Sequence, residues 1–129
     1  MDLPEAIDRL TQGDYSGAAV IAKVFAEFID DDRASLNRAI NGQCHKGLRT
    51  AIRERRWRHH IAQAVALIDH QGATNHSLAV SLHNGFQRLE RSHRAPVTPL
   101  GKALAAAMQA HPRGGTSIQA LSVLVGAVR

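Results

Sequence analysis

The chain has 129 residues, of which 44% are hydrophobic and 21% charged, so it can build a sizeable core and is not a disordered protein. Aromatic residues make up only 4% and alanine is abundant, which favours helix over sheet. The formal net charge is +5, the single cysteine cannot form an internal disulfide, and no apolar stretch is long enough for a membrane helix. Because the N-terminus is acidic and lacks a signal peptide's apolar stretch, we expect a cytoplasmic protein without a membrane segment.

Residues 1–32 predict two helices. The first places Leu3, Ala6, Ile7 and Leu10 on one face, has Pro4 in its first turn and ends near Gly13. The second is capped by Asp14 or Ser16 and carries apolar residues at helical spacing: Ala18, Ile21, Ala22, Phe25, Phe28 and Ile29. The acids at 30–32 suit the start of a following helix better than the end of this one.

The turn between these two helices resembles that of a tetratricopeptide repeat. In that family a Gly-Asp-Tyr-like turn precedes an alanine where the helices approach closely, and Gly13, Asp14, Tyr15 and Ala18 match these places. The match covers Leu10 to Lys23, and no convincing repeat of the expected length follows. The resemblance implies an adaptor or chaperone-like module that binds a partner protein.

Residues 33–70 carry two apolar faces that one straight helix cannot easily bury together. The first face is Leu36, Ile40, Cys44, Leu48, Ala51 and Ile52, and the second is Trp57, Ile61, Ala64, Val65 and Ile68. Their offset predicts either a break near Arg53–Arg56 or a π-bulge. Asn41-Gly42 is a second possible break.

Three more helices are expected in the remainder. The first follows a cap at Thr74 or Asn75 and ends near His93, and the second has Thr98 as cap and Pro99 at its first position. The third follows Thr116 or Ser117, and its wide apolar face, which includes Val123, suggests a place in the core or in a dimer contact. We therefore expect an all-α protein of six to eight short helices forming one compact bundle, a single domain over residues 1–129.

The charges are sorted along the chain. Residues 1–32 hold eight acids and two bases, whereas residues 33–129 hold three acids and fourteen bases. If the region from Arg38 to His60 is helical, one stripe contains Arg38, His45, Arg49, Arg53, Arg56 and His60. Such a stripe predicts binding along a phosphate backbone, with contacts from Arg38, Lys46, Arg49, Arg53, Arg55, Arg56, Arg58 and His60. Two alternatives are a charge match with the acidic N-terminal helices or a partner protein, and a merely solvated face.

The segment around Asn41-Gly42 also resembles a helix-turn-helix in outline. A short helix, an Asn-Gly turn and a longer basic helix with Lys46, Arg49 and Arg53 have the required order. Aligning the turn on Gly42 places Asn37, Arg38 and Gln43 where small or apolar residues belong. The resemblance therefore covers the order of elements and not their detailed pattern.

Catalytic and metal sites are not indicated. The eight histidines lack metal-ligand spacing, and most are expected to face solvent. Cys44 lies on the predicted apolar face and is expected to be buried and inert. Acids are too sparse after residue 32 for a carboxylate-pair site. We expect a non-enzymatic nucleic-acid-binding or regulatory protein of bacterial or phage origin, without a cofactor and with a homodimer as an option; the alternative is the helical adaptor.

Overall fold

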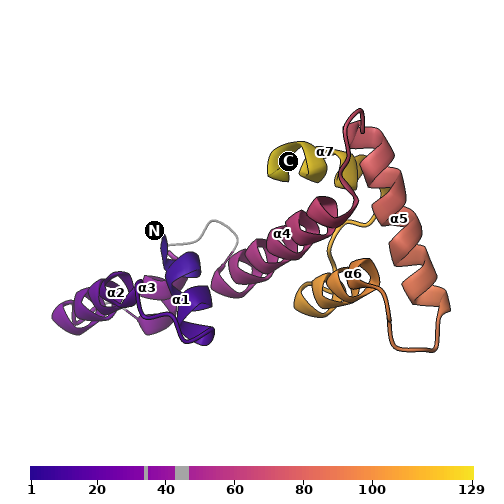
Figure 1. The fold of residues 1–129 in the computed structure, drawn as a ribbon. Coiled ribbons are helices and arrows are strands. Elements are labelled where there is room, and N and C mark those ends of the chain that lie inside the picture. Colours follow the sequence, from indigo (N-terminus) through magenta and orange to yellow (C-terminus); the bar gives the residue numbers. More distant parts are fainter. Residues whose placement is uncertain (34, 43–46) are drawn as a thin grey trace. The chain divides into compact units, whose positions relative to one another are not determined.

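The computed structural model describes residues 1–33, 35–42 and 47–129, and over these residues it contains helices and no strand (Figure 1). The helices are α1 (Leu3–Thr11), α2 (Ala18–Asp30), α3 (Leu36–Asn41), α4 (Leu48–Ile68), α5 (Asn75–Arg91), α6 (Pro99–Ala110) and α7 (Ile118–Val128). The expected all-α fold is confirmed. In the described part of the chain, none of the helices has the length and apolar character needed to cross a membrane.

The chain divides into two compact units, Met1–Arg55 and Arg56–Arg129, and each is described here by itself. The first unit contains α1, α2, α3 and the start of α4, and the second contains the rest of α4 with α5, α6 and α7. Folding of the whole chain as one domain stays a prediction.

The start of α1 agrees with the sequence expectation, and the start of α2 does not. Asp2 caps α1 by accepting a hydrogen bond from the Glu5 amide. The helix ends before Gly13, which adopts a φ of +81°. α2 begins after Gly17 without a side-chain cap, so the prediction of Asp14 or Ser16 as its cap is wrong. Asp14 Oδ1 instead accepts a hydrogen bond from the Ser16 amide in a tight turn before the helix. This oxygen therefore does not cap α2.

α1 comes close to the start of α2 at Gly17, one residue before the position that the tetratricopeptide resemblance indicates. A Cβ on Gly17 would lie 2.6 Å from both Cα and Cβ of Ala6, so only glycine fits. Ala18 is exposed and takes no part in this contact. The close helix approach therefore exists, but Ala18 does not provide it.

α2 buries much less of its apolar surface than its sequence suggests. Only Val24 is buried, whereas Phe25 and Ile29 are 42% and 72% exposed. The expected use of acids at the start of the next helix is also wrong. α3 is capped by Ser35 and has no acid in its first turn, while Asp31 accepts the Arg33 amide.

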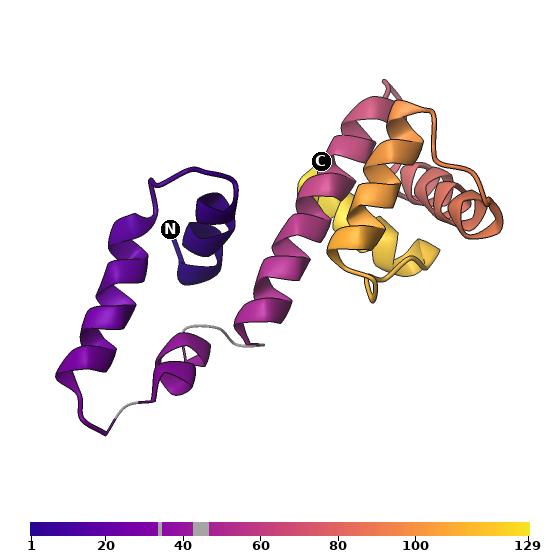
Figure 2. The same cartoon turned by 90° about the horizontal axis from the view of Figure 1, so that it is seen from below.

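α4 is one uninterrupted helix through Arg53–Arg56, with neither a break nor a π-bulge there (Figure 2). Both proposed ways of absorbing the offset between the apolar faces are therefore wrong. Leu48 and Ile52 are half-buried in the first unit, and Trp57 and Ile61 are buried in the second. One continuous helix can bury both apolar faces because each face packs within a different unit. The predicted stop at Asn41-Gly42 is confirmed, since Gly42 is the C-cap of α3.

The second unit has a continuous apolar core to which α4, α5, α6 and α7 all contribute. Trp57 stacks on Phe86 with ring centroids 5.4 Å apart, and α5 and α6 meet where Gly85 faces Leu104. The buried members of this core are Trp57, Ile61, Ala64, Val65, Leu78, Ala79, Leu82, Phe86, Leu104, Ala107, Leu121 and Val125.

The helix starts of the second unit agree with the sequence. Thr74, Thr98 and Ser117 cap α5, α6 and α7, each accepting a backbone amide through its hydroxyl. The expectation that α7 contributes to the core is also correct. Leu121 and Val125 are fully buried, although Val123 is 73% exposed.

Candidate nucleic-acid interface

The predicted basic stripe does not run along one helix from Arg38 to His60. Arg38 lies on α3, which ends at Asn41, and α4 begins only at Leu48. The candidate residue Lys46 lies outside the described residues, as do His45, Cys44 and Gln43, on which other expectations depend. The assumption of a single helix is wrong because Gly42 ends α3 and Gly47 adopts a φ of +84° before α4.

Four of the predicted residues share one face of α4, which we call the arginine face: Arg49, Arg53, Arg56 and His60. Their spacings of four, three and four residues place them along successive turns, over about 17 Å of helix. Arg49 and Arg53 are exposed, whereas Arg56 and His60 are half-buried. His60 contacts Gln63 through Nδ1 at 3.3 Å and stands edge-on to the ring of His59.

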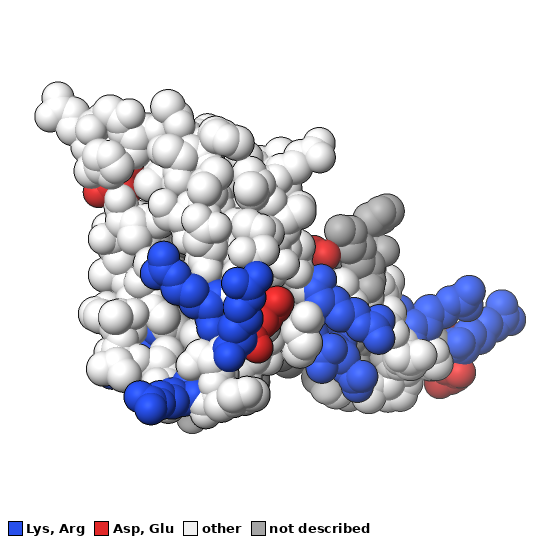
Figure 3. All heavy atoms as spheres, turned by 90° about the vertical axis from the view of Figure 1, so that its right-hand side faces the viewer, with Lys and Arg blue, Asp and Glu red and all other residues white. Residues whose placement is uncertain are grey.

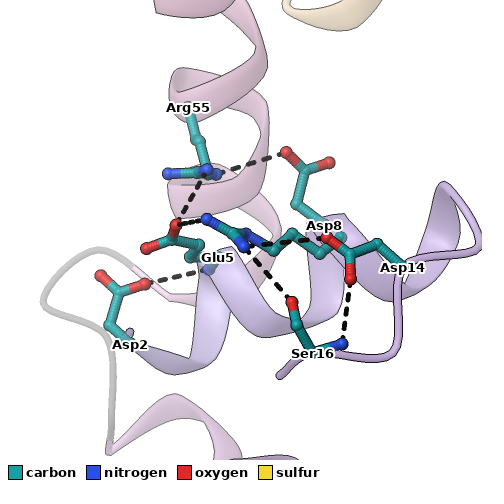
Figure 4. A network of polar contacts seen from close by, with 7 residues as sticks. Asp2, Glu5, Asp8, Asp14, Ser16 and Arg55 are labelled. Atoms are coloured by element: carbon teal, nitrogen blue, oxygen red, sulfur yellow. Dashed lines mark hydrogen bonds and ion pairs between the residues drawn. The ribbon is translucent and has the colours of Figure 1, made fainter. Parts of the chain in front are cut away.

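Arg55 lies on another side of α4 than the arginine face, and it contacts acids of α1 (Figure 4). Its Nη2 lies 3.4 Å from Glu5 Oε1, and its Nε lies 3.4 Å from Asp8 Oδ2. Asp8 is only 6% exposed, so a nearby cation offsets part of the cost of burying its carboxylate. The charge match between the acidic N-terminal helices and the basic block therefore exists at Arg55.

The acids around Arg55 belong to a wider network within α1 and the turn after it. Arg9 pairs with Glu5 at 2.7 Å and with Asp14 at 3.7 Å, so Glu5 contacts two guanidinium groups (Figure 4). Hydrogen bonds from the Ser16 amide and hydroxyl, and the nearby Arg9 charge, lower the pKa of Asp14 below its ordinary value. The network thus places Glu5, Asp8 and Asp14 beside the guanidinium groups of Arg9 and Arg55.

The two bases at the start of α4 have a different environment from Arg55. The ion pairs found among the described residues do not include Arg49 or Arg53, and the exposed Arg58 is likewise outside them. α4 thus divides its bases: Arg55 neutralises acids of α1, while Arg49 and Arg53 present their guanidinium groups to solvent.

A second group of bases, at the end of α5, was missed by the sequence reasoning. Arg88 and Arg91 occupy the last turn of α5, and Arg94 follows it; all three are exposed. Figure 3 shows Lys and Arg side chains gathered on this face toward the end of α5 that is lower in Figure 1. The three-residue spacing of these arginines is visible in the sequence, but the phosphate contact was predicted for the denser basic block around α4. They also favour the helix end electrostatically.

The connection between α3 and α4 departs from a helix-turn-helix. That motif needs a turn of three or four residues, whereas residues 42–47 separate the two helices here. The Leu48 amide donates to Asn41 Oδ1 at 3.3 Å, which ties the start of α4 to the end of α3. The order of elements is present, but the separation between the two helices is longer than the turn of that motif.

The described residues do not group His, Cys, Asp and Glu side chains into a set of three or more that could hold a metal ion. Most histidines in this part of the chain are exposed, as expected, with two informative exceptions besides His60. His83 Nδ1 lies 2.7 Å from the Thr116 carbonyl oxygen, and His111 stands edge-on to Trp57. Both join secondary-structure elements of the second unit.

No protein-family model, curated protein or solved structure shows significant similarity to this chain.

Proposed function

We propose that this protein is a non-enzymatic, cytoplasmic nucleic-acid-binding protein that contacts phosphates through the arginine face of α4. The observation that supports this most directly is the division of bases on α4. Arg49 and Arg53 are exposed, lie one helical turn apart and take no part in the ion pairs found among residues 1–33, 35–42 and 47–129, while the neighbouring Arg55 is held by Glu5 and Asp8. Guanidinium groups spaced by one turn can each take a phosphate in a bidentate contact.

Phosphate binding of this kind has a characteristic dependence on salt. Each phosphate that an arginine neutralises releases condensed counterions, so affinity falls steeply as salt rises. The contact carries no sequence information, and the proposal therefore covers duplex and single-stranded nucleic acid without a defined site. Arg88, Arg91 and Arg94 are available for an additional backbone contact.

The test compares Arg53→Ala with Arg55→Ala in binding to short duplex and single-stranded oligonucleotides across a salt series. Arg53→Ala should weaken binding at low salt and reduce the slope of log affinity against log salt by about one. Arg55→Ala should leave this slope unchanged, because its side chain is committed to α1. It should instead cost about 1 kcal/mol of stability, a modest value because the guanidinium is partly exposed.

Circular dichroism and the fluorescence of Trp57 establish that both variants fold before their affinities are compared. Absence of binding at about 50 mM salt would rule out the proposal, since electrostatic binding is strongest there. Equal slopes for the two variants would contradict the role given to Arg53. A defined protein partner retained at high salt would favour the adaptor function instead.

A further inference from the structure

α2 carries an apolar face that its own unit leaves exposed. Ala18, Ala22, Phe25 and Ile29 follow spacings of four, three and four residues, so they lie on one side of the helix. All four are exposed, and Ile29 reaches 72%. We call this set the outer stripe of α2. The opposite side of the helix carries Val24, the one buried residue of α2.

The outer stripe has the residue spacing of a helix–helix seam. Single exposed apolar residues are common on protein surfaces, but four consecutive seam positions without a polar residue are typical of a helix that packs against another helix. Residues on the polar side of α2, Lys23 and Glu27, lie well away from this line. The stripe therefore indicates a helical partner.

The sizes of the side chains favour a second copy of α2 running in the opposite direction. The stripe begins with two alanines and ends with Phe25 and Ile29. An antiparallel copy related by a twofold axis places Ala18 against Ile29 of the other protomer and Ala22 against Phe25. Each small residue then faces a large one, which lets two helices pack at constant separation. A parallel pair would set the large residues against each other and leave the alanines apart.

The charges at the two ends of α2 favour the same arrangement. The N-terminus has no side-chain cap and no acid in its first turn, and the C-terminus has no base in its last turn. Asp30 ends the helix, and Asp31 and Asp32 follow it, where they oppose its dipole. In an antiparallel pair these acids approach the uncapped, positively polarised start of the partner helix. The unfavourable ends of one copy complement those of the other.

We propose that the protein self-associates through the outer stripe of α2, forming an antiparallel twofold pair of α2 helices. The contact involves one short helix from each protomer, so its area is at the low end for specific interfaces. Association is accordingly weak and depends on concentration. This inference does not depend on nucleic-acid binding, and it assigns the interface to α2 rather than to α7, where the sequence suggested a dimer contact.

Sedimentation velocity of the full chain tests the interface. Protein concentrations of about 5 to 500 μM cover the range of a weak association. Ile29→Glu is compared with Val123→Glu on α7; these side chains are 72% and 73% exposed, so a charge should cost similar folding energy at either place. We expect the wild type and Val123→Glu to form dimers as concentration rises, and Ile29→Glu to stay monomeric with an unchanged helical spectrum. A monomeric wild type throughout the range, or loss of association in Val123→Glu alone, would overturn the proposal.

Disulfide cross-linking tests the direction of the helices. In a Cys44→Ser background, Ala18→Cys and Ile29→Cys proteins are oxidised separately and as a mixture. Positions 18 and 29 are about 17 Å apart along a helix, so an antiparallel pair should form the mixed disulfide and not either homodisulfide. Homodisulfides of both variants without an excess of the mixed species would contradict the antiparallel arrangement.

Discussion

A single hydrogen atom in place of a side chain decides the packing around Trp57. A Cβ on Gly114 would lie 2.7 Å from two carbons of the indole, which is already stacked on Phe86 and has His111 at its edge. Phe86 and His111 restrict the movement of the ring on two sides. The requirement for glycine at this position comes from the tertiary contact, whereas the sequence shows Gly114 only as part of a Pro-Arg-Gly-Gly linker.

Gly114→Ala should lower the free energy of unfolding of residues 56–129 by about 1 to 3 kcal/mol, because overpacking against a fixed ring forces a shift of the core. Denaturation followed by fluorescence measures this directly, since Trp57 is the only tryptophan. The adjacent Gly115→Ala is the control. Its Cβ would come within 3.1 Å of the Ala120 methyl group, a contact that small adjustments relieve. Equal losses in the two variants would contradict the role assigned to the indole.

Arg53 and Arg55 show how little a linear pattern says about the environment of one side chain. Both stand in the same basic block, and the sequence assigned both to a phosphate contact. Arg53 is exposed, but Arg55 is two residues further along the helix, about 200° around its axis, and meets Glu5 and Asp8. The sequence predicts that the acid-rich N-terminus competes for the basic block. Its point of contact could not be derived without the fold.

At the scale of elements, caps were more predictable than the course of the longest helix. Thr74, Thr98 and Ser117 act through hydrogen bonds to amides three residues away, so their signal is contained in a few letters of sequence. The expected interruption of α4 was inferred from its two apolar faces, under the assumption of one core. The helix continues because Leu48 and Trp57 are packed in different units.

The start of α5 allows a quantitative test of such a local signal. Thr74 Oγ1 accepts the Ser77 amide at 3.0 Å, and the Ser77 hydroxyl accepts the Thr74 amide at the same distance. Thr74→Ala should cost about 1 kcal/mol in urea unfolding. The double variant with Ser77→Ala should cost less than the sum of the single changes, because both remove the same reciprocal cap.

Ser81→Ala serves as the control for this cycle. Ser81 lies on the same helix and donates only to the carbonyl of Ser77 one turn earlier, so its loss should change stability by less than about 0.5 kcal/mol. Strict additivity of Thr74→Ala and Ser77→Ala would show that the two hydrogen bonds act independently.

At the scale of the whole molecule, the two proposed properties are coupled. A dimer formed through α2 would present two copies of the arginine face, and a nucleic acid long enough to meet both would be bound with an avidity that a single copy lacks. Ile29→Glu should therefore weaken binding to a long duplex by at least about tenfold, and change binding to a duplex that accommodates one protomer very little.

Gel-shift titrations with duplexes of the two lengths measure this difference. Equal weakening on both would show that Ile29 affects the binding surface itself, and no weakening on either would show that dimerisation and nucleic-acid binding are independent. Val123→Glu, with a similarly exposed side chain, should match the wild type on both lengths.

The sequence by itself determined the all-α class, the caps of α5, α6 and α7 and the stop at Asn41-Gly42, because propensity, capping and apolar periodicity act over a few neighbouring residues. Only the tertiary structure decided which apolar faces find partners and which charges are neutralised. The outer stripe of α2 and the buried face of α7 look alike in the sequence, and so do Arg53 and Arg55. Burial and ion pairing depend on residues brought together from distant parts of the chain, as Gly17 meets Ala6 and Arg55 meets Asp8.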